Sequence, residues 1–421
     1  FKYLNFFLEE IEIISSSNFN FIYFILPLGI SFFTFQQISF LVDLKRKKFN
    51  FEDINFTKYA AYITFFPQLI AGPIVRYLEV SSDFSKKNKR KVLHNLIVGI
   101  LIFTIGLFKK VIIADSFSEY SNILFDNLAP SSNKLQLIET WFCVFAYSFQ
   151  LYFDFSAYSD MALGIARMFG IKIPFNFIAP YRSLTITQFW KRWHITLSNW
   201  LRDYLFIPLG GSKHGNYLTI RNLFIVMVIG GIWHGAGWTF LIWGVVHALY
   251  LVEEKFITNK IFLPYSNFFI IKIFLWSIFF IKLSIAWVFF RSPDIVTSFK
   301  IILALFNFSE IILPLKVINY LELFTNFNFE KGITFRYFNG VSALKNLLLG
   351  LIICLFGFCV YDLNPSLGSH EKKFYRINKP LYKVIINKNL SIFLFTLVLT
   401  ACFFYSLIYI SRPSTFLYFQ F

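Results

Sequence analysis

The sequence has few charged residues. Asp, Glu, Lys and Arg make up only 15% of its 421 residues, whereas 57% of the residues are hydrophobic. A soluble globular chain usually has about 25% charged and 45–50% apolar residues. The mean hydropathy of +0.59 also exceeds that of an ordinary soluble chain. Disorder is excluded, because 21% of the residues are aromatic and disordered chains are poor in aromatics. The composition therefore favours a membrane protein.

Cysteine is also scarce, and its positions exclude a disulfide scaffold. The four cysteines lie in apolar runs without metal-ligand spacing, so we interpret them as small core residues and expect no metal site. The motifs of zinc proteases, serine hydrolases and phosphate-binding loops are missing too. None of these common catalytic classes therefore fits the chain. The cysteines are Cys143, Cys354, Cys359 and Cys402.

Acidic residues are fewer than basic residues. The 23 acids face 40 Lys and Arg, which gives a net charge of +17. The basic residues cluster between apolar stretches, as the positive-inside rule requires of cytoplasmic loops. We therefore predict no nucleic-acid partner, although basic loops could attract a phosphorylated cytoplasmic ligand. The chain begins with Phe1 rather than Met, so its natural N-terminus is expected to be incomplete.

Long apolar stretches are abundant. A helix needs about 20 apolar residues to cross the hydrocarbon core, and the runs here are too long and too continuously apolar for a β-barrel. We predict an all-α polytopic membrane protein with a single transmembrane domain over residues 1–421 and its catalytic motifs within 150–251. The predicted windows are 18–42, 92–114, 137–166, 218–236, 237–254, 264–290, 341–361 and 390–411.

The segment 56–75 breaks this regular pattern. Basic clusters at 45–48 and 86–91 flank it, and both should be cytoplasmic. A single spanning helix would put them on opposite sides, and Pro67, Gly72 and Pro73 would break such a helix. We predict a re-entrant hairpin with a cavity beside it, because irregular backbone in a membrane must be covered by protein or water. A proline-kinked spanning helix remains the alternative.

Residues 185–206 form a candidate amphipathic helix. Thr185 followed by Gln188 resembles a capping box. Lys191, His194, Ser198 and Arg202 would share an arc of about 80° at 100° per residue. This basic face suits a cavity wall or a membrane interface. A plain interfacial helix with a solvated histidine is the alternative.

His234 is the strongest single candidate for a catalytic residue. It lies 13 residues after Arg221, or about 20 Å deeper if Arg221 marks the cytoplasmic interface. An ionisable residue at that depth is a functional-site hypothesis by default, and a desolvated neutral imidazole can accept a proton. The alternative is a neutral histidine bonded between helices. Trp233 and Trp238 could line a cavity beside it.

Three further polar residues are given structural interpretations. His247 lies about 220° from His234 on a continuous helix, so we interpret it as a satisfied core histidine. Asp154 and Asp160 lie inside an apolar window and need partners. We interpret them mainly as members of an ion-pair network, with direct catalysis as the alternative. The partners that we expect for them are arginines, namely Arg167, Arg182, Arg192 and Arg202.

Six segments of the chain form an ordered set of motifs, namely PLGISFFTFQQISFLVD (27–43), YITFFPQLIAGPIVR (62–76), QLYFDFSAYSDMALGIARMFGIKIPFNF (150–177), TQFWKRWHITLSNWLRDYLFIPLGG (187–211), GGIWHGAGWTFLIWGVVHALYL (230–251) and FLYFQF (416–421). Together these segments resemble the membrane-bound O-acyltransferase (MBOAT) family, in its bacterial branch of alginate and peptidoglycan O-acetyltransferases. The resemblance covers nearly the whole chain and is weakest over 291–390.

The resemblance implies a fold and a reaction. It implies tilted and re-entrant helices around a central tunnel in the bacterial inner membrane, with functional histidines at His194 and His234. An acyl group from a cytoplasmic donor, here acetyl-CoA as a substrate rather than a tightly bound cofactor, would cross toward an envelope polysaccharide such as peptidoglycan or alginate. A separate periplasmic acetyltransferase subunit is the expected partner.

We therefore predict an O-acyltransferase with His234 as general base and His194 positioning the donor or stabilising developing charge. The predicted donor and tunnel residues are Lys191, Arg192, Trp193, Ser198, Arg202, Trp233 and Trp238. Two alternatives remain. One is D-alanyl transfer to teichoic acid by the same chemistry. The other is a transporter of an acyl donor or polysaccharide precursor, because interrupted helices and midplane polar residues also occur in transporters.

Overall fold

The computed structural model describes most of the chain. The described residues are 3–15, 29–85, 92–131, 135–261, 268–308, 312–314, 330–332, 389–411 and 416–417. The predicted window 341–361 lies outside them, as do Cys354 and Cys359. The other apolar windows contain helices, whose bounds follow.

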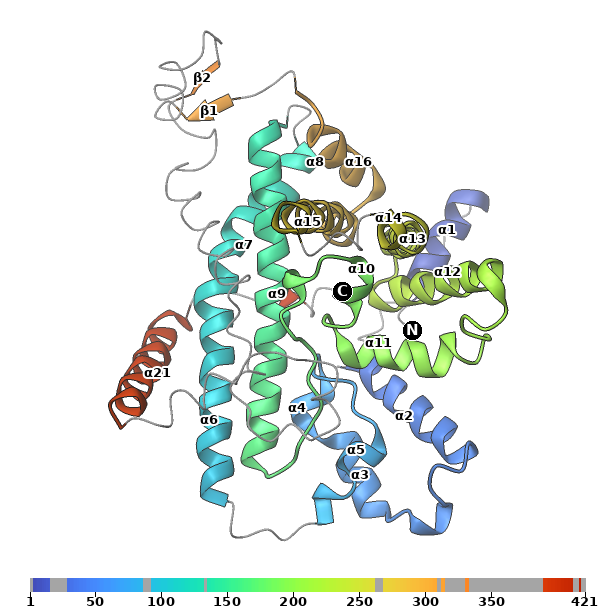
Figure 1. Ribbon diagram of the computed structural model, residues 1–421, viewed down its shortest axis with the longest axis vertical. Helices are drawn as coiled ribbons and strands as arrows, with labels where there is room; N and C mark the ends of the chain where they lie inside the picture. The colour runs from blue at the N-terminus through green and yellow to red at the C-terminus, as the bar shows by residue number, and fades with distance from the viewer. Residues whose placement is uncertain are drawn as a thin grey trace.

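Two long helical segments form the spine of the molecule (Figure 1). The first runs without interruption through α6 (Val92–Phe108), the π-helix η4 (Lys109–Ala114), α7 (Asp115–Asn122) and the π-helix η5 (Ile123–Leu128), and is followed by α8 (Ala129–Ser131). The second is α9 (Leu137–Met168), which packs along α6 and α7. A Cβ atom at Gly106 or Gly164 would lie within 3 Å of the opposite backbone. These glycines therefore allow the two backbones to approach closely.

The N-terminal third consists of short helices. They are α1 (Leu4–Ser15), α2 (Ile30–Lys45), η1 (Phe51–Asp53), α3 (Phe56–Thr64), α4 (Phe66–Leu69), α5 (Tyr77–Val80) and η2 (Asp83–Ser85). The predicted interruption of 56–75 is confirmed, because α3 ends before Phe65 and residues 70–76 are not helical. At 1.5 Å per residue, nine-residue α3 is about 13 Å long and too short to cross a membrane.

The middle of the chain carries the histidine motifs. Its elements are η6 (Pro180–Arg182), α10 (Ile186–Trp190), α11 (Ile195–Leu201), η7 (Arg202–Phe206), α12 (Gly215–His234), α13 (Trp238–Glu253), η8 (Glu254–Thr258) and α14 (Asn259–Ile261). Helices α12 and α13 pack with their backbones in direct contact. A Cβ atom at Gly231 would lie 2.3 Å from the carbonyl oxygen of Phe240, and one at Gly244 would lie 2.5 Å from that of Met227.

The rest of the described chain adds α15 (Phe269–Arg291), α16 (Ile295–Ala304) and α21 (Asn389–Tyr409). Two three-residue strands, β1 (Ile312–Pro314) and β2 (Glu330–Gly332), pair in parallel. Three helices of the described chain are long and apolar enough to cross a membrane, namely Val92–Leu128, Gly215–His234 and Phe269–Arg291. The predicted helical membrane fold is confirmed, with this short strand pair as an addition.

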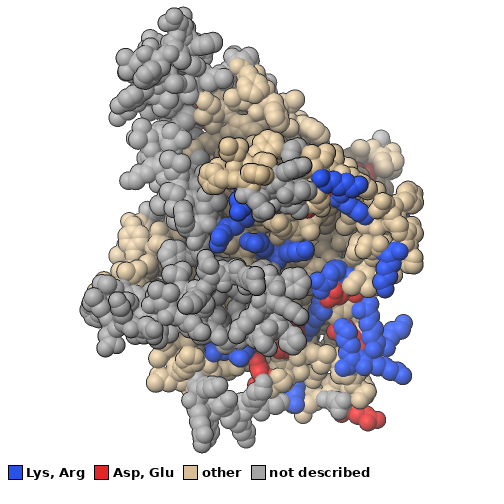
Figure 2. Space-filling model, viewed as in Figure 1, with Lys and Arg blue, Asp and Glu red and all other residues tan. Residues whose placement is uncertain are grey.

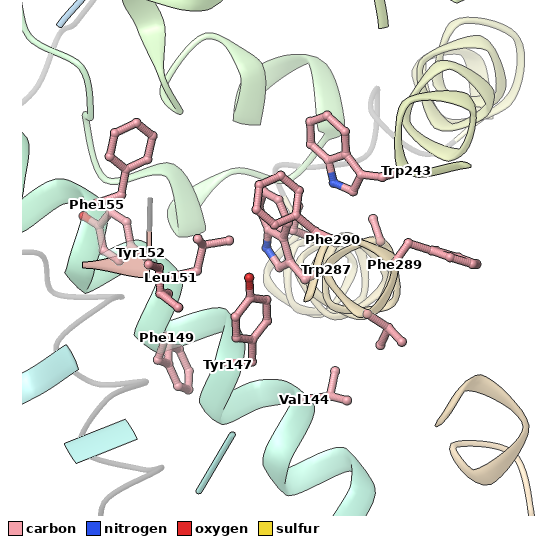
Figure 3. Packing of buried hydrophobic residues seen from close by; sticks show 14 of the residues in the cluster. Val144, Tyr147, Phe149, Leu151, Tyr152, Phe155, Trp243, Trp287, Phe289 and Phe290 are labelled. Carbon is pink, nitrogen blue, oxygen red and sulfur yellow. The ribbon is translucent and has the colours of Figure 1, made fainter. Parts of the chain in front are cut away.

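Aromatic side chains build the core between α9, α10, α13 and α15. Tyr147 and Phe149 of α9 and Trp287 of α15 are fully buried, and Trp243 of α13 packs against Trp287 with ring centroids 5.9 Å apart (Figure 3). Large rings offer extensive burial, and their offset and edge-on contacts add further stabilisation. The segment of α10 and the following turn, which contains several of the predicted donor residues, therefore lies against an aromatic core.

The predicted polar core exists, but its cations are lysines. Asp160 is paired with Lys109, and Asp154 accepts from Lys110 Nζ at 2.7 Å. Lys110 also pairs with Asp115 at 2.8 Å. The expectation of arginine partners was wrong, because the π-helix η4 on the neighbouring spine helix turns both lysines toward α9. Paired and buried, these charges act as structural links between the two spine segments.

Candidate active site

His194 does not lie on a continuous helix. Helix α10 ends at Trp190, Lys191 to Trp193 form a turn, and α11 begins at Ile195. His194 adopts a left-handed backbone conformation with φ of 42°, which is strained for a residue with a side chain. The predicted single amphipathic helix over 185–206 was therefore wrong. The kink turns the His194 side chain inward, where the residue is completely buried.

The start of α10 matches the sequence prediction in part. The Thr185 hydroxyl accepts from the backbone N–H of Gln188 at 3.2 Å, as a capping box requires. The Gln188 amide oxygen, however, accepts from the backbone N–H of Leu184 rather than from that of Thr185. Both bonds satisfy otherwise unpaired donors at the helix start.

Asn176 fixes the orientation of the His194 ring. Its Oδ1 atom lies 3.1 Å from His194 Nδ1 and accepts from both the backbone N–H and the hydroxyl of Thr196. The backbone N–H can only donate, so this atom of Asn176 must be the amide oxygen. A carbonyl oxygen is an acceptor, so Nδ1 of His194 carries the proton. The neutral ring then has its lone pair on Nε2, where it can act as a base or an acceptor.

His234 and His194 both contact Trp233. His234 is the last residue of α12, where Gly235 leaves the helix in extended conformation, and it is 7% exposed. Its ring centroid lies 5.0 Å from that of Trp233, and the His194 centroid lies 6.1 Å from Trp233. Two histidines 40 positions apart in the sequence thus contact one indole ring.

His247 lies closer to His234 than the sequence suggested. Both rings contact Trp243, at centroid distances of 5.2 Å for His234 and 4.7 Å for His247. The prediction that the two histidines could not share a face was wrong, because it assumed a continuous helix and the chain reverses direction at Gly235–Gly237. His247 is also not a satisfied core histidine, since neither ring nitrogen has a hydrogen-bond partner among the described residues.

A cavity of about 750 Å³ is lined by Lys191, Ile195 and Thr196, which are close to His194 in the sequence; neither His194 nor His234 is among its lining residues. Its wall begins at Ile74, directly after the Pro67–Pro73 segment where the sequence placed a cavity, and continues along α10, α11, η7 and α12. The Thr196 side chain connects this wall to Asn176, and therefore to His194. The polar residues of the wall are Arg76, Glu79, Thr187, Lys191, Thr196, Ser198, Asn199, Arg202 and Asp203.

Charges are concentrated at one end of this cavity. Asp203 accepts hydrogen bonds from Arg76 at 2.8 Å and from Arg202 at 2.7 Å. Burial opposes ionisation of Asp203, but these two bonds together hold the pKa of its carboxyl below its usual range. Burial raises the pKa of Glu79, whose side chain accepts from the Arg76 backbone N–H. Figure 2 shows basic side chains gathered over the region of α2 and α11 on this face.

The predicted donor residues are only partly brought together. Lys191, Ser198 and Arg202 line the cavity. Trp193 does not, because it is 3% exposed and packs in the aromatic core against Trp287. Arg192 is not among the lining residues, and it is half-buried beside Trp193.

The two tryptophans predicted beside His234 have different surroundings. Trp233 is buried and contacts both motif histidines, with Phe35 of α2 stacked on it at 5.2 Å. Trp238 is 45% exposed, and its indole N–H donates to Glu10 of α1. Trp238 therefore lies at the surface beneath α1 and does not line this cavity.

The chain matches the family model of MBOAT, the membrane-bound O-acyltransferase family, over residues 11–293. It is 42% identical over 326 residues to a peptidoglycan O-acetyltransferase of Helicobacter pylori. It is 40% identical over 316 residues to a probable alginate O-acetylase, AlgI, of Pseudomonas syringae. These alignments cover 72% and 74% of this chain, and 61% and 58% of those proteins. The chain belongs to the membrane-bound O-acyltransferase family.

The chain thus spans about three fifths of the length of these relatives. Teichoic acid D-alanyltransferases of Streptococcus thermophilus and Bacillus subtilis are more distant, at 29% and 31% identity over 53% and 54% of this chain. The MBOAT match contains both motif histidines, the cavity wall and the interrupted segment 56–75.

Sequence reasoning missed Asn176, Arg76 and Asp203. Each lies inside a segment that carries the family resemblance, so their neighbourhood was marked but their contacts were not. Asn176 reaches His194 across 18 residues, and Arg76 reaches Asp203 across 127. Hydrophobic periodicity in the sequence gives no indication of contacts between residues that are this far apart. Among the described residues, no three His, Cys, Asp or Glu side chains gather where they could hold a metal ion.

Proposed function

We propose that this chain transfers an acetyl group from acetyl-CoA toward hydroxyl groups of an envelope polysaccharide, peptidoglycan or an alginate-like polymer. It would act as a multi-pass protein of the bacterial inner membrane. The observation that carries the proposal is the placement of two buried histidines on one tryptophan, one of them linked through Asn176 and Thr196 to the wall of a cavity that contains basic residues. The names of the most similar relatives support the acetyl group and the polymer class.

The basic residues of the cavity wall suit the donor. Coenzyme A carries phosphates, and Arg and Lys side chains bind phosphate oxygens with charge-assisted hydrogen bonds. Lys191 and Arg202 of the wall are exposed and can reach a ligand. The phosphates would lie there, with the acetyl thioester directed toward the aromatic core and His234. The donor acts as a substrate and leaves as free CoA.

The proposed chemistry needs one general base. His234 accepts the proton of the acceptor hydroxyl, and the oxygen attacks the thioester carbonyl carbon. The C–S bond breaks, an ester forms, and the proton passes to the departing thiolate to give CoA. His194, held by Asn176 with its lone pair on Nε2, positions the donor or stabilises developing charge. A positioned general base contributes about 10²–10⁴-fold to a rate.

The acceptor could be the polymer itself or an intermediate carrier. We propose a periplasmic acetyltransferase subunit as partner, because no described part of the chain forms a separate domain that could hold a polysaccharide. A transporter without bond formation is disfavoured by membership in a family of acyltransferases.

D-alanyl transfer to teichoic acid is the second candidate. The two D-alanyltransferases among the relatives favour it, but at lower identity and coverage than the acetylating relatives.

Wall analysis separates the two candidates. The gene is deleted in its own host, and wall polymers are digested and analysed by mass spectrometry, with the wild-type gene and His234→Ala restored in parallel. Loss of acetyl esters that only the wild-type gene restores supports the proposal. Loss of D-alanyl esters with acetyl esters unchanged would replace the proposal by the second candidate.

A further inference from the structure

Three buried aromatic residues, Trp243, His247 and Trp287, form a cluster with the half-buried Trp190 of the cavity wall, and we call these four residues the indole–imidazole cluster. The His247 ring lies 5.2 Å from Trp190, 4.7 Å from Trp243 and 6.1 Å from Trp287, between ring centroids. His247 is 0% exposed, and Trp243 and Trp287 are each 1% exposed. Figure 3 shows Trp243 and Trp287 approaching each other from α13 and α15.

The polar atoms of this cluster lack protein partners. The three indole N–H groups and both nitrogens of His247 are buried, and none has a hydrogen-bond partner within the part of the chain that the structure describes. Buried polar groups in proteins are nearly always hydrogen-bonded, so one such group calls for an explanation. Five such atoms on mutually contacting rings indicate a site built to bind something.

The chemistry of the cluster selects its ligand. An indole N–H only donates, and a neutral imidazole adds one donor and one acceptor. The site therefore offers mainly donors and requires an acceptor oxygen. Lys282, which lies over the ring of Tyr250 next to His247, is paired with Glu253 at 2.8 Å. With His247 neutral, the four side chains of the cluster carry no charge, so they offer a phosphate or carboxylate no counter-charge of their own. A neutral carbonyl oxygen fits.

The cluster connects the cavity with His234. Trp190 lines the cavity and contacts both Trp243 and His247. Trp243 in turn contacts His234 at a centroid distance of 5.2 Å. The contacts Trp190–Trp243–His234 thus form a continuous chain of rings from the cavity wall to His234.

We propose that the indole–imidazole cluster binds the carbonyl oxygen of the acyl group, with N–H donors from His247 and Trp243. The inference rests on the proposed function, since it takes the donor to be an acyl thioester. His247 is then a binding residue for the thioester carbonyl. The site recognises an acyl thioester by its oxygen and leaves the phosphates of the donor to the cavity wall.

Paired ligands test this directly. The purified full chain in detergent is titrated calorimetrically with acetyl-CoA and with S-ethyl-CoA, which lacks only the carbonyl oxygen. One net hydrogen bond is worth about threefold to tenfold in affinity, so the wild-type protein should bind acetyl-CoA more tightly by about that factor. His247→Phe and Trp243→Phe keep an aromatic ring but remove the N–H donor, and each should bring the two affinities together. His247→Gln retains a donor and should keep part of the preference.

Trp141→Phe is the matched control. Its indole N–H donates to the Leu305 carbonyl at 2.9 Å, on the far side of α9, so the variant should keep the full preference. Thermal unfolding verifies that each variant is folded. Equal affinities of wild type for the two ligands, or a preference that survives in His247→Phe, overturn the inference. A preference without thioester turnover would instead refute the proposed transfer chemistry and leave the carbonyl site standing.

Discussion

The Nδ1 atom of His194 and the Oδ1 atom of Asn176 lie 3.1 Å apart in the buried interior. This contact joins the loop that follows α9 to the break between α10 and α11. It is supported by Thr196, whose hydroxyl donates to the same oxygen and accepts from the backbone N–H of Ile74 at 2.9 Å. The tautomer of His194 is therefore set by a chain of hydrogen bonds that ends at the cavity wall.

Asn176→Leu should weaken catalysis by removing this orientation. Without the acceptor, the imidazole can adopt the other tautomer, so we expect kcat to fall about tenfold or more, with the KM for acetyl-CoA changed little. Steady-state kinetics of thioester consumption measure both values. Asn176→Asp retains an acceptor and should recover part of the rate. A tenfold change in KM with kcat intact would assign Asn176 to donor binding instead.

Arg202→Gln should affect the donor rather than the chemistry. Arg202 lines the cavity at its charged end, where its head group can bind a phosphate. A charge-assisted hydrogen bond is worth about 1.5–3 kcal/mol, so KM for acetyl-CoA should rise roughly tenfold or more while kcat stays within about twofold. Lys213→Gln, at an exposed position after η7, is the control. Unchanged KM in Arg202→Gln would place the phosphates elsewhere.

Asp203 gives the fold an acid-sensitive contact. Its pKa is depressed in the folded protein, so its contribution to stability is present above the unfolded pKa of about 3.9 and is lost as pH falls through the folded value. At pH 7 the wild type should unfold at a higher temperature than Asp203→Asn. The difference in unfolding temperature between the two proteins should narrow below about pH 4. Differential scanning fluorimetry at both pH values measures this difference. A difference that is constant with pH would contradict the depressed pKa of Asp203.

Two adjacent glycines should respond differently to alanine. A Cβ atom at Gly231 would lie 2.3 Å from the Phe240 carbonyl oxygen, whereas one at Gly230 would meet only the Leu201 side chain at 3.4 Å. Overpacking costs about 1–3 kcal/mol, and here the obstacle is backbone. Gly231→Ala should therefore reduce thermal stability and separate His234 from Trp243, while Gly230→Ala should remain close to wild type. Equal behaviour of the two variants would show that α12 and α13 are not in backbone contact.

Composition was sufficient to predict a helical membrane protein, because hydrophobic runs and helix length depend only on local sequence. The interruption at Pro67–Pro73 was predicted for the same reason, since proline removes a helical hydrogen bond wherever it occurs. The geometry of the site was harder to predict from the sequence. A regular 3.6-residue period placed Lys191, His194 and Arg202 on one face, but the left-handed residue at His194 ends the helix between them. That strain is stabilised by Asn176, a tertiary contact that periodicity cannot report.

The histidines illustrate the same limit. Gly231 and Gly244 place α12 against α13. The sequence could not show that the chain reverses direction at Gly235–Gly237, which brings His247 onto the same tryptophan as His234. Likewise, Asp154 needed a cation on general grounds. Its partner is Lys110, whose orientation depends on the π-helix in the neighbouring segment.

The role of His234 as general base is tested by the consumption of radiolabelled acetyl-CoA by the purified chain. Wild type, His234→Ala and the control His94→Ala, at an exposed histidine, are compared at equal folded concentration. The account predicts thioester loss by wild type and His94→Ala, and a rate about 10²–10⁴-fold lower in His234→Ala. A rate in His234→Ala within a few-fold of wild type would contradict the account, because the buried imidazole would then take no part in the transfer.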